Sequence, residues 1–203
     1  MSIVRCFNHT RLTQQVKLLT IISIMSGHSK WSTIKHKKAL TDAKRSKVFS
    51  KIASVVTIAA KKGSDPLKNP TLRTAIEKAR EVNMPKENIE RAIKRGTGEI
   101  GGAEIEEVIY GAFGPGGVAM LITAITDNKN RTLSEIKQVL KSHNAKFTEI
   151  NSIQWMFHRD GADWVPNSPI KIEDEDIKKH LDALYDDLDE QQDTSEIYDN
   201  IGN

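Results

Sequence analysis

The run VAMLITAIT, from Val118 to Thr126, decides the fold of the second half of this 203-residue chain. It is apolar, rich in β-branched residues and bounded by turn residues, which predicts a buried β-strand. The GPGG just before it (114–117) predicts a tight turn whose glycines adopt positive φ. EIEEVIYGAF (104–113) precedes that turn and alternates towards a second strand. We therefore expect two consecutive strands joined by a glycine-rich turn.

Helical and strand patterns alternate farther along the chain. NRTLSEIKQVLKSH (130–143) and DEDIKKHLDALYDDL (174–188) place apolar residues at helical spacing, which predicts two amphipathic helices. Further strands are predicted at SIQWMFHR (152–159), SPIKI (168–172) and SEIYDNI (195–201). Strands interleaved with two helices predict an α/β sandwich over residues 99–203, with both helices on one face of a sheet.

Residues 26–98 carry apolar positions at helical spacing throughout. The first helix is predicted from Thr41 to Lys62, the second begins at NPT (69–71), and the third runs from Pro85 to Arg95. The second has an asparagine suited to cap it, followed by a proline suited to its first turn. The three stripes predict a small bundle around one core. The predicted fold class is therefore α+β, a three-helix bundle followed by the sandwich, with the boundary near the glycine-rich RGTGEIGGA (95–103).

The net charge of the chain is only +3, but its distribution is uneven. Residues 26–98 hold 18 Lys or Arg against 6 Asp or Glu, whereas residues 99–203 hold 9 against 21. A basic half followed by an acidic half favours an anionic partner for the first half and a different role for the second. The alternative is accidental asymmetry between two solvated domains.

Residues 1–25 are cationic, free of acids and mildly apolar, which is typical of a targeting peptide. The alternative is that translation begins at Met25, so that the preceding leader is a misassigned start. Neither interpretation makes the leader part of the fold. No apolar run approaches the roughly 18 residues of a membrane span. We expect a cytoplasmic protein without a membrane partner, or a mitochondrial one if residues 1–25 are a transit peptide.

Residues suited to catalysis do not assemble into a recognisable site. The single cysteine, Cys6, lies in the leader, and His28 and His36 have no carboxylate or thiolate at metal-ligand spacing. GPGG lacks the Lys-Ser/Thr ending of a phosphate-binding loop, and the polar residues of TDNKNRT (126–132) are explained by helix capping and turn formation. We predict no enzymatic activity, no metal or cofactor and no small-molecule substrate.

The stretch GHSKWSTIKHKKALTDAKRSK, from Gly27 to Lys47, is the strongest functional signal. Seven of its 21 residues are Lys or Arg, two more are His, and one is acidic. Such a stretch can meet several phosphates and release their counterions, although a solvated charge run is the usual alternative. Trp31 either packs on the bundle or stacks on an exposed base, and packing is favoured because Ile34 lies one turn away.

Three basic residues, Lys44, Lys47 and Lys51, share one face of the first predicted helix, and the third helix ends in a second basic group. We therefore expect these side chains to face outward and to bind nucleic acid. The predicted nucleic-acid-binding residues are His28, Lys30, Trp31, Lys35, His36, Lys37, Lys38, Lys44, Arg45, Lys47, Lys51, Arg91, Lys94 and Arg95.

The stretch from Glu173 to Asp193 holds ten acids and two lysines. Acids at the start of a helix favour its dipole, but those from Asp186 to Glu190 lie near the helix end, where they disfavour it. We interpret them as a solvated edge that points away from any bound phosphate.

Four stretches of the chain resemble the YebC/PmpR family in order and spacing. They are GHSKWSTIKHKKALTDAKRSKVFSKI, NPTLRTAIEKAREVNMPKENIERAIKRGTGE, GAFGPGGVA and TDNKNRT. The resemblance covers about residues 25–160 and resumes at WVPNSPIKI and SEIYDNI. It implies an N-terminal helical domain followed by α/β domains. It also implies nucleic-acid contacts at the matching basic positions. Family members usually continue into another small α/β domain where this chain has only ADWV, so that domain is expected to be missing.

Two functions remain open. The resemblance implies a DNA-binding regulator of transcription, and related members are tied to translation, which implies binding to rRNA or tRNA on the ribosome. Charge alone does not separate them, because both partners offer phosphates. No helix-turn-helix with Asn or Gln on a recognition helix is evident, which favours binding dominated by the nucleic-acid backbone.

Overall fold

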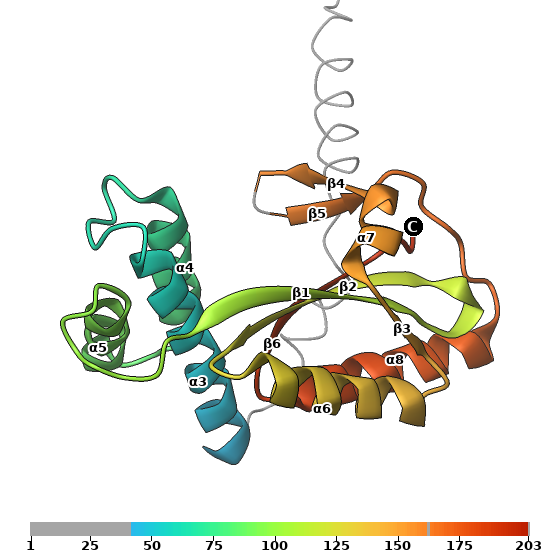
Figure 1. Ribbon diagram of the computed structural model, residues 1–203, viewed down its shortest axis with the longest axis horizontal. Helices are drawn as coiled ribbons and strands as arrows, with labels where there is room; N and C mark the ends of the chain where they lie inside the picture. The colour runs from blue at the N-terminus through green and yellow to red at the C-terminus, as the bar shows by residue number, and fades with distance from the viewer. Residues whose placement is uncertain (1–41, 162, 203) are drawn as a thin grey trace, which may run out of the picture.

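The computed structural model describes residues 42–161 and 163–202. Figure 1 shows two parts side by side, a group of helices at one end of the molecule and a sheet flanked by further helices. The first part contains α3 (Asp42–Ala60), α4 (Pro70–Glu81) and α5 (Lys86–Gly96). The predicted α+β class, with a helical N-terminal part, is confirmed.

The three helices share one core, as their apolar stripes predicted. Val56, Leu72 and Ala79 are completely buried in it. Asn69 joins two of the helices. Its Oδ1 accepts the N–H of Leu72 at 3.1 Å, which caps α4, and its Nδ2 donates to the carbonyl of Ala59 at 2.8 Å. One buried side chain therefore fixes the end of α3 against the start of α4.

Gly96 allows α5 to approach α3 closely. A Cβ atom at this position would lie 2.3 Å from the carbonyl oxygen of Thr57 and 2.7 Å from the Cβ of Ala60. The Thr57 hydroxyl also donates to the carbonyl of Ala92 at 3.2 Å. The C-terminal part of α5 is thus packed against the second half of α3.

The second part is built on a four-stranded antiparallel sheet in the order β3-β1-β2-β6. Its strands are β1 (Glu106–Phe113), β2 (Ala119–Thr126), β3 (Lys146–Thr148) and β6 (Thr194–Asp199). All eight residues of β2 are buried, because this strand has neighbours on both edges and cover on both faces. The turn before it, η1 (Pro115–Gly117), has φ of 70° at Gly116 and 73° at Gly117, so the predicted positive-φ turn is confirmed.

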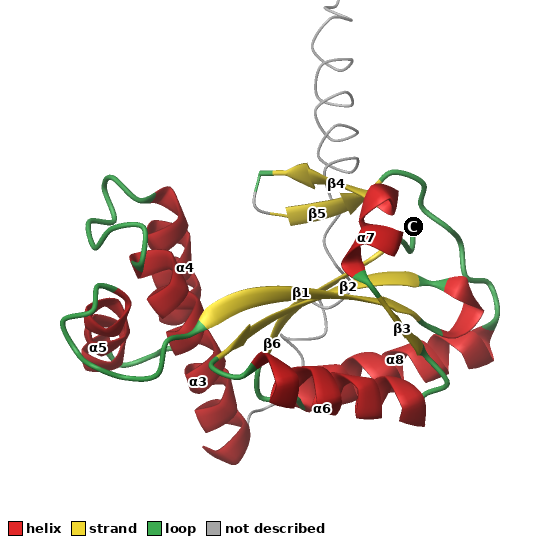
Figure 2. Ribbon diagram, in the orientation of Figure 1, coloured by secondary structure: helices red, strands yellow, loops and turns green. Residues whose placement is uncertain are grey.

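Two helices, α6 (Lys129–Ser142) and α8 (Glu175–Glu190), cover one face of this sheet (Figure 2). Ile136, Leu184 and Leu188 are fully buried there against alternate residues of β2 such as Met120 and Ile122. Every second side chain of β2 points to this face, and the apolar side chains of α6 and α8 recur every three or four residues on the side that packs against it. The prediction that both helices lie on one face is confirmed.

The opposite face carries a smaller layer. It consists of α7 (Ile150–Ile153), η2 (Gln154–Met156) and the hairpin of β4 (Phe157–Asp160) and β5 (Asp163–Pro166), which forms a separate two-stranded sheet. Leu121, Phe157 and Trp164 are buried in the second core beneath it. Figure 1 shows this layer and the two long helices on opposite sides of the main sheet.

The strand predicted over 152–159 is wrong at residues 152–156, which form helical turns. Ile150, Ile153 and Phe157 are spaced by three and four residues, so a helical turn brings all three to the same small core. The short strands β3 and β5 were not predicted. The strand expected at 168–172 is reduced to one parallel bridge between Ile170 and Ile201.

Three lysines of the bundle connect it to the acidic part. The Nζ atoms of Lys51 and Lys78 lie 2.9 Å from Oδ1 of Asp189 and 2.7 Å from Oε1 of Glu196, respectively. Lys61 donates to the carbonyl of Ile105 at 2.7 Å, where the chain enters β1. Charges of opposite sign therefore meet between the two parts. From the separate core of the bundle and the uneven charge distribution, we predict that residues 26–98 fold alone.

Candidate nucleic-acid interface

Half of the predicted nucleic-acid-binding residues fall outside the residues that the structure describes. They are His28, Lys30, Trp31, Lys35, His36, Lys37 and Lys38. The described part of the basic surface begins on α3, whose first residue is Asp42. Lys44 belongs to the first turn of this helix, and Arg45 and Lys47 follow with exposed side chains.

Lys51 does not face outward, so the expectation that it continues the exposed surface of Lys44 and Lys47 is wrong. Its side chain is only 10% exposed, and its ammonium contacts the Asp189 carboxylate at 2.9 Å. It also donates to the main-chain carbonyl of Asp189. Lys51 therefore joins α3 to α8, and we leave it out of the candidate interface.

The same contact revises the interpretation of the acidic helix end. The last carbonyls of a helix lack partners within it and attract cations, and Lys51 supplies a cation to the last turn of α8. Oδ2 of Asp187 lies 2.7 Å from Nε2 of His143 at the end of α6. Residues 186–190 thus form a solvated edge only in part, because Asp187, with 55% of its side chain exposed, is paired with His143, and Asp189 is paired with Lys51.

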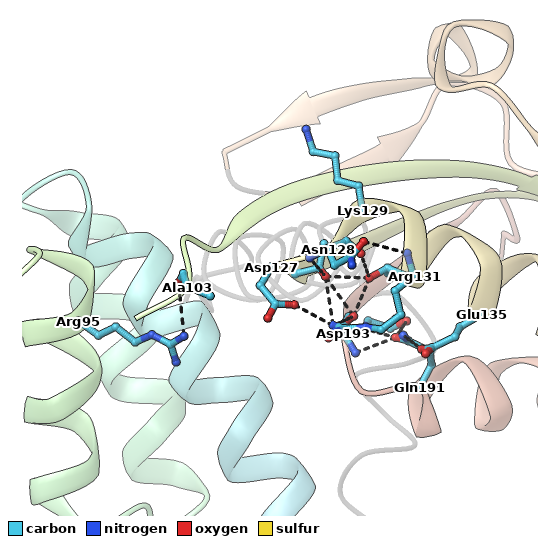
Figure 3. Close-up of polar contacts among 12 residues, drawn as sticks. Arg95, Ala103, Asp127, Asn128, Lys129, Arg131, Glu135, Gln191 and Asp193 are labelled. Carbon is cyan, nitrogen blue, oxygen red and sulfur yellow. Dashed lines mark hydrogen bonds and ion pairs between the residues drawn. The ribbon is translucent and has the colours of Figure 1, made fainter. Parts of the chain in front are cut away.

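The second basic group lies on α5. Arg91 and Lys94 are exposed. Arg95 donates from Nη2 to the carbonyl of Ala103 at 3.4 Å, so part of its guanidinium holds the linker between the two halves (Figure 3). Figure 1 places α5 at the end of the molecule farthest from α6 and α8.

The structure does not bring the two basic groups into one pocket. The end of α5 packs beside Thr57, ten residues beyond Lys47 on the same helix. At 1.5 Å per residue this separation is about 15 Å along α3. On one DNA strand, with a charge about every 3.4 Å of axis, the same distance spans about four phosphates. An extended surface of this kind suits a linear polyanion better than a small anion.

A polar cluster fixes the junction between β2, α6 and β6 (Figure 3). Oδ2 of Asp193 accepts hydrogen bonds from Thr132 at 2.6 Å and from Arg131 at 2.9 Å. Asn128 caps α6 by accepting the N–H of Arg131 at 3.1 Å, as the capping interpretation of TDNKNRT predicted. Nothing in the local sequence indicates that Asp193, 61 residues beyond Thr132, completes this cluster.

The cluster changes the acidity of its members. Burial alone would raise the pKa of Asp193, but hydrogen bonds from Thr132 and Arg131 outweigh burial and lower it. The hydrogen bond to Asp193 in turn raises the pKa of the Arg131 guanidinium. The carboxylate is therefore held ionised, and its contacts explain its presence without any chemical role.

We expect Asp193→Asn to remove an acid-dependent part of the stability. Because the pKa of Asp193 is lowered on folding, its stabilisation is complete above the unfolded value of about 3.9 and is lost as the pH falls through the folded value. The variant should lose about 1–3 kcal/mol of unfolding free energy at pH 7 and vary less with pH below about 4. Urea unfolding at several pH values measures both effects. Exposed Asp186→Asn is the control, and a variant whose pH profile parallels the parent's would contradict the assignment.

Among residues 42–161 and 163–202, no group of three or more His, Cys, Asp or Glu side chains is placed to hold a metal ion. Within the same ranges, no helix combines the length and the apolar character needed to cross a membrane.

Both parts of the chain match sequence models of known protein domains. A sequence model of the TACO1/YebC protein N-terminal domain matches residues 29–99, and a model of the TACO1/YebC second and third domain matches residues 105–162. A probable transcriptional regulatory protein of Pseudothermotoga lettingae is 49% identical over 174 residues, which cover 85% of this chain and 69% of that protein. The chain belongs to the TACO1/YebC family. The expected resemblance is confirmed.

Two further proteins are similar to this member of the TACO1/YebC family. A probable transcriptional regulatory protein of Dictyoglomus turgidum is also 49% identical over 174 residues, covering 85% of this chain and 70% of that protein. The crystal structure of a conserved hypothetical protein from Aquifex aeolicus superposes with a TM-score of 0.75 at 32% identity, covering 86% of this chain and 97% of that one. The two matched domains meet between residues 99 and 105, where α5 has ended and β1 is about to begin.

Proposed function

We propose that this TACO1/YebC-family protein is a DNA-binding regulator of transcription that acts in the cytoplasm and has no catalytic role. The observation that carries the proposal is the exposed basic surface of the bundle, formed by Arg45 and Lys47 on α3 and by Arg91 and Lys94 on α5. The relatives named as probable transcriptional regulatory proteins support the regulatory part.

The proposed binding mode follows from the kind of residue on this surface. Exposed lysine and arginine side chains on two helices, α3 and α5, suit several phosphates along one strand. Phosphate contacts position a protein on a duplex but carry no sequence information directly. We therefore expect modest sequence preference from the bundle. Figure 1 shows the acidic α8 against the α/β sheet and far from α5, and its last turn contacts α3 through the pair of Asp189 and Lys51.

The test is the salt dependence of duplex DNA binding by the full chain. Replacing Lys47, Arg91 and Lys94 with alanine removes three phosphate contacts, and each contributes about 0.9 to the slope of log K against log salt. The slope should flatten by about 2.7 units, as measured by fluorescence anisotropy.

A matched control removes the same charge from the acidic half, through alanine at the exposed Lys146, Lys171 and Lys179. This control should keep most of the parent's slope. A triple variant of the bundle that also keeps the parent's slope would sink the proposal. Tighter binding to structured RNA than to duplex DNA at equal salt would replace DNA with RNA as the partner.

A further inference from the structure

Trp155, in η2, leaves 72% of its surface exposed. Aromatic side chains normally bury most of their large apolar area. The indole N–H is nevertheless satisfied within the protein, because Nε1 donates to the carbonyl of Ser152 at 2.9 Å. This bond fixes one edge of the ring against the end of α7 while the ring itself stays open to solvent.

Asn167 fixes the backbone that carries this ring. Its Nδ2 donates to the carbonyl of Trp155 at 2.8 Å, and its own N–H donates to the carbonyl of Met156 at 2.8 Å. Its Oδ1 lies 2.7 Å from Nδ1 of His158. Because the amide nitrogen is used on Trp155, the amide oxygen must accept, which assigns the hydrogen to Nδ1 of His158. The exposed imidazole keeps Nε2 as a second hydrogen-bonding atom, three residues after Trp155 in sequence.

The surroundings of Trp155 do not form an apolar docking patch. In the part of the chain that the structure describes, the other exposed large hydrophobic residues are Leu67 and Ile100, which belong to the helical half and its linker. Protein-binding hot spots normally sit within a well-packed, desolvated cluster. The exposed residues near Trp155 in sequence are instead polar, namely Asn151, Ser152 and Gln154 before it and His158, Arg159 and Asp160 after it.

An isolated flat ring with amide groups around it suits a nucleobase. Every base has a π-face that stacks on an aromatic side chain, and amide groups pair with base edges. The position is also electrostatically suitable, because α7, which directly precedes η2, lies on the face of the sheet opposite α8, whose carboxylates would repel phosphates (Figure 2). Arg159, held 4.1 Å above the ring of Trp164, adds a cation to the same layer.

We propose that Trp155 is a stacking platform for one unpaired nucleobase, with the exposed side chains of Gln154 and His158, one and three residues away in sequence, to meet the base edge. This inference rests on the proposed nucleic-acid-binding function and names its ligand more closely. The bundle follows phosphates of any strand, whereas Trp155 binds only where a base is unpaired, in single-stranded RNA or DNA.

The experiment compares the full-length parent with Trp155→Ala and Trp155→Phe by fluorescence anisotropy. The probes are a short labelled oligoadenylate RNA, its DNA counterpart and a blunt DNA duplex. Trp155→Ala should weaken binding to the single strands by about 5- to 150-fold and leave duplex binding unchanged. Trp155→Phe should lose less, because it keeps a stacking face. The thermal unfolding midpoint should not move, since the ring is exposed.

Leu67→Ala is the matched control, because Leu67 is 85% exposed and should change none of these affinities. If the parent and Trp155→Ala bind single strands equally well, and duplex binding still depends on the lysines, the stacking platform is overturned but the proposed DNA binding is not. A parent that binds no nucleic acid would overturn both proposals. A loss of self-association on Trp155→Ala, with unchanged single-strand affinity, would make the ring a protein contact and also overturn the platform. The RNA and DNA arms distinguish the two sources of the unpaired base.

Discussion

Replacing Lys30, Lys35, Lys37 and Lys38 together with alanine is expected to weaken duplex DNA binding by about three to four orders of magnitude at about 0.1 M salt. Each phosphate contact adds about 0.9 to the negative slope of log K against log salt. Four contacts therefore account for a rise of about 3.6 orders of magnitude in affinity as the salt concentration falls from about 1 M to about 0.1 M, because counterion release favours binding more at low salt. The expectation rests on the sequence, because these lysines precede the described residues.

The measurement is a titration of labelled duplex at several salt concentrations, with parent and variant extrapolated to high salt. A charge-matched control carries alanine at Lys141, Lys146, Lys171 and Lys179, all exposed in the acidic half. It should lose much less affinity. Equal losses in the two variants would mean that net charge, and not the opening stretch, governs binding.

Leu184→Ala is expected to cost about 2–5 kcal/mol of unfolding free energy, the range for a fully buried leucine whose cavity cannot close. Leu184 is completely buried between α8 and the sheet. One of its Cδ atoms lies near the turn before β2, 3.6 Å from where a Cβ at Gly114 would sit. The cavity would therefore open beneath both the helix and the turn.

Urea unfolding at neutral pH measures the loss. Leu67→Ala is the control, since exposed Leu67 should change stability by no more than about 0.5 kcal/mol. A loss at Leu184 as small as at Leu67 would contradict the packing of α8 on the sheet.

The long elements could be predicted from the sequence because each repeats its period several times. The apolar run of β2 and the stripes of α4, α6 and α8 are of this kind. β3 has only three residues, and its register, with Gly111 opposite Thr148, depends on a partner strand far away in sequence. Residues 152–156 fall within the predicted strand 152–159 because this run is short and apolar. Helical packing of Ile153 on β1, where Gly111 leaves room for it, decides otherwise.

The candidate site was predictable as a surface but not in its detail. Charge and spacing identified the basic face of α3, but nothing local shows that Lys51 turns to Asp189, which lies 138 residues later. Likewise, nothing local shows that Arg131 donates to Asp193, which lies 62 residues later. Among the tryptophans, Trp31 is the one that the sequence indicates as a binding residue, because its neighbours are charged. The exposure of Trp155 became visible only once its segment proved to be helical.

The central position of β2 has a consequence for the order in which the chain can fold during synthesis. The bundle is complete in sequence at Gly96, and β1 can pair with β2 as soon as Thr126 has emerged, but the partner on the other edge of β2 begins only at Thr194. At about 5–20 residues per second, a ribosome needs on the order of several seconds to supply β6. Throughout that interval a strand that is buried in the finished protein has one unpaired edge, which favours association with other chains. The nascent chain is therefore most prone to aggregate after β2 has been synthesised and before its last strand arrives.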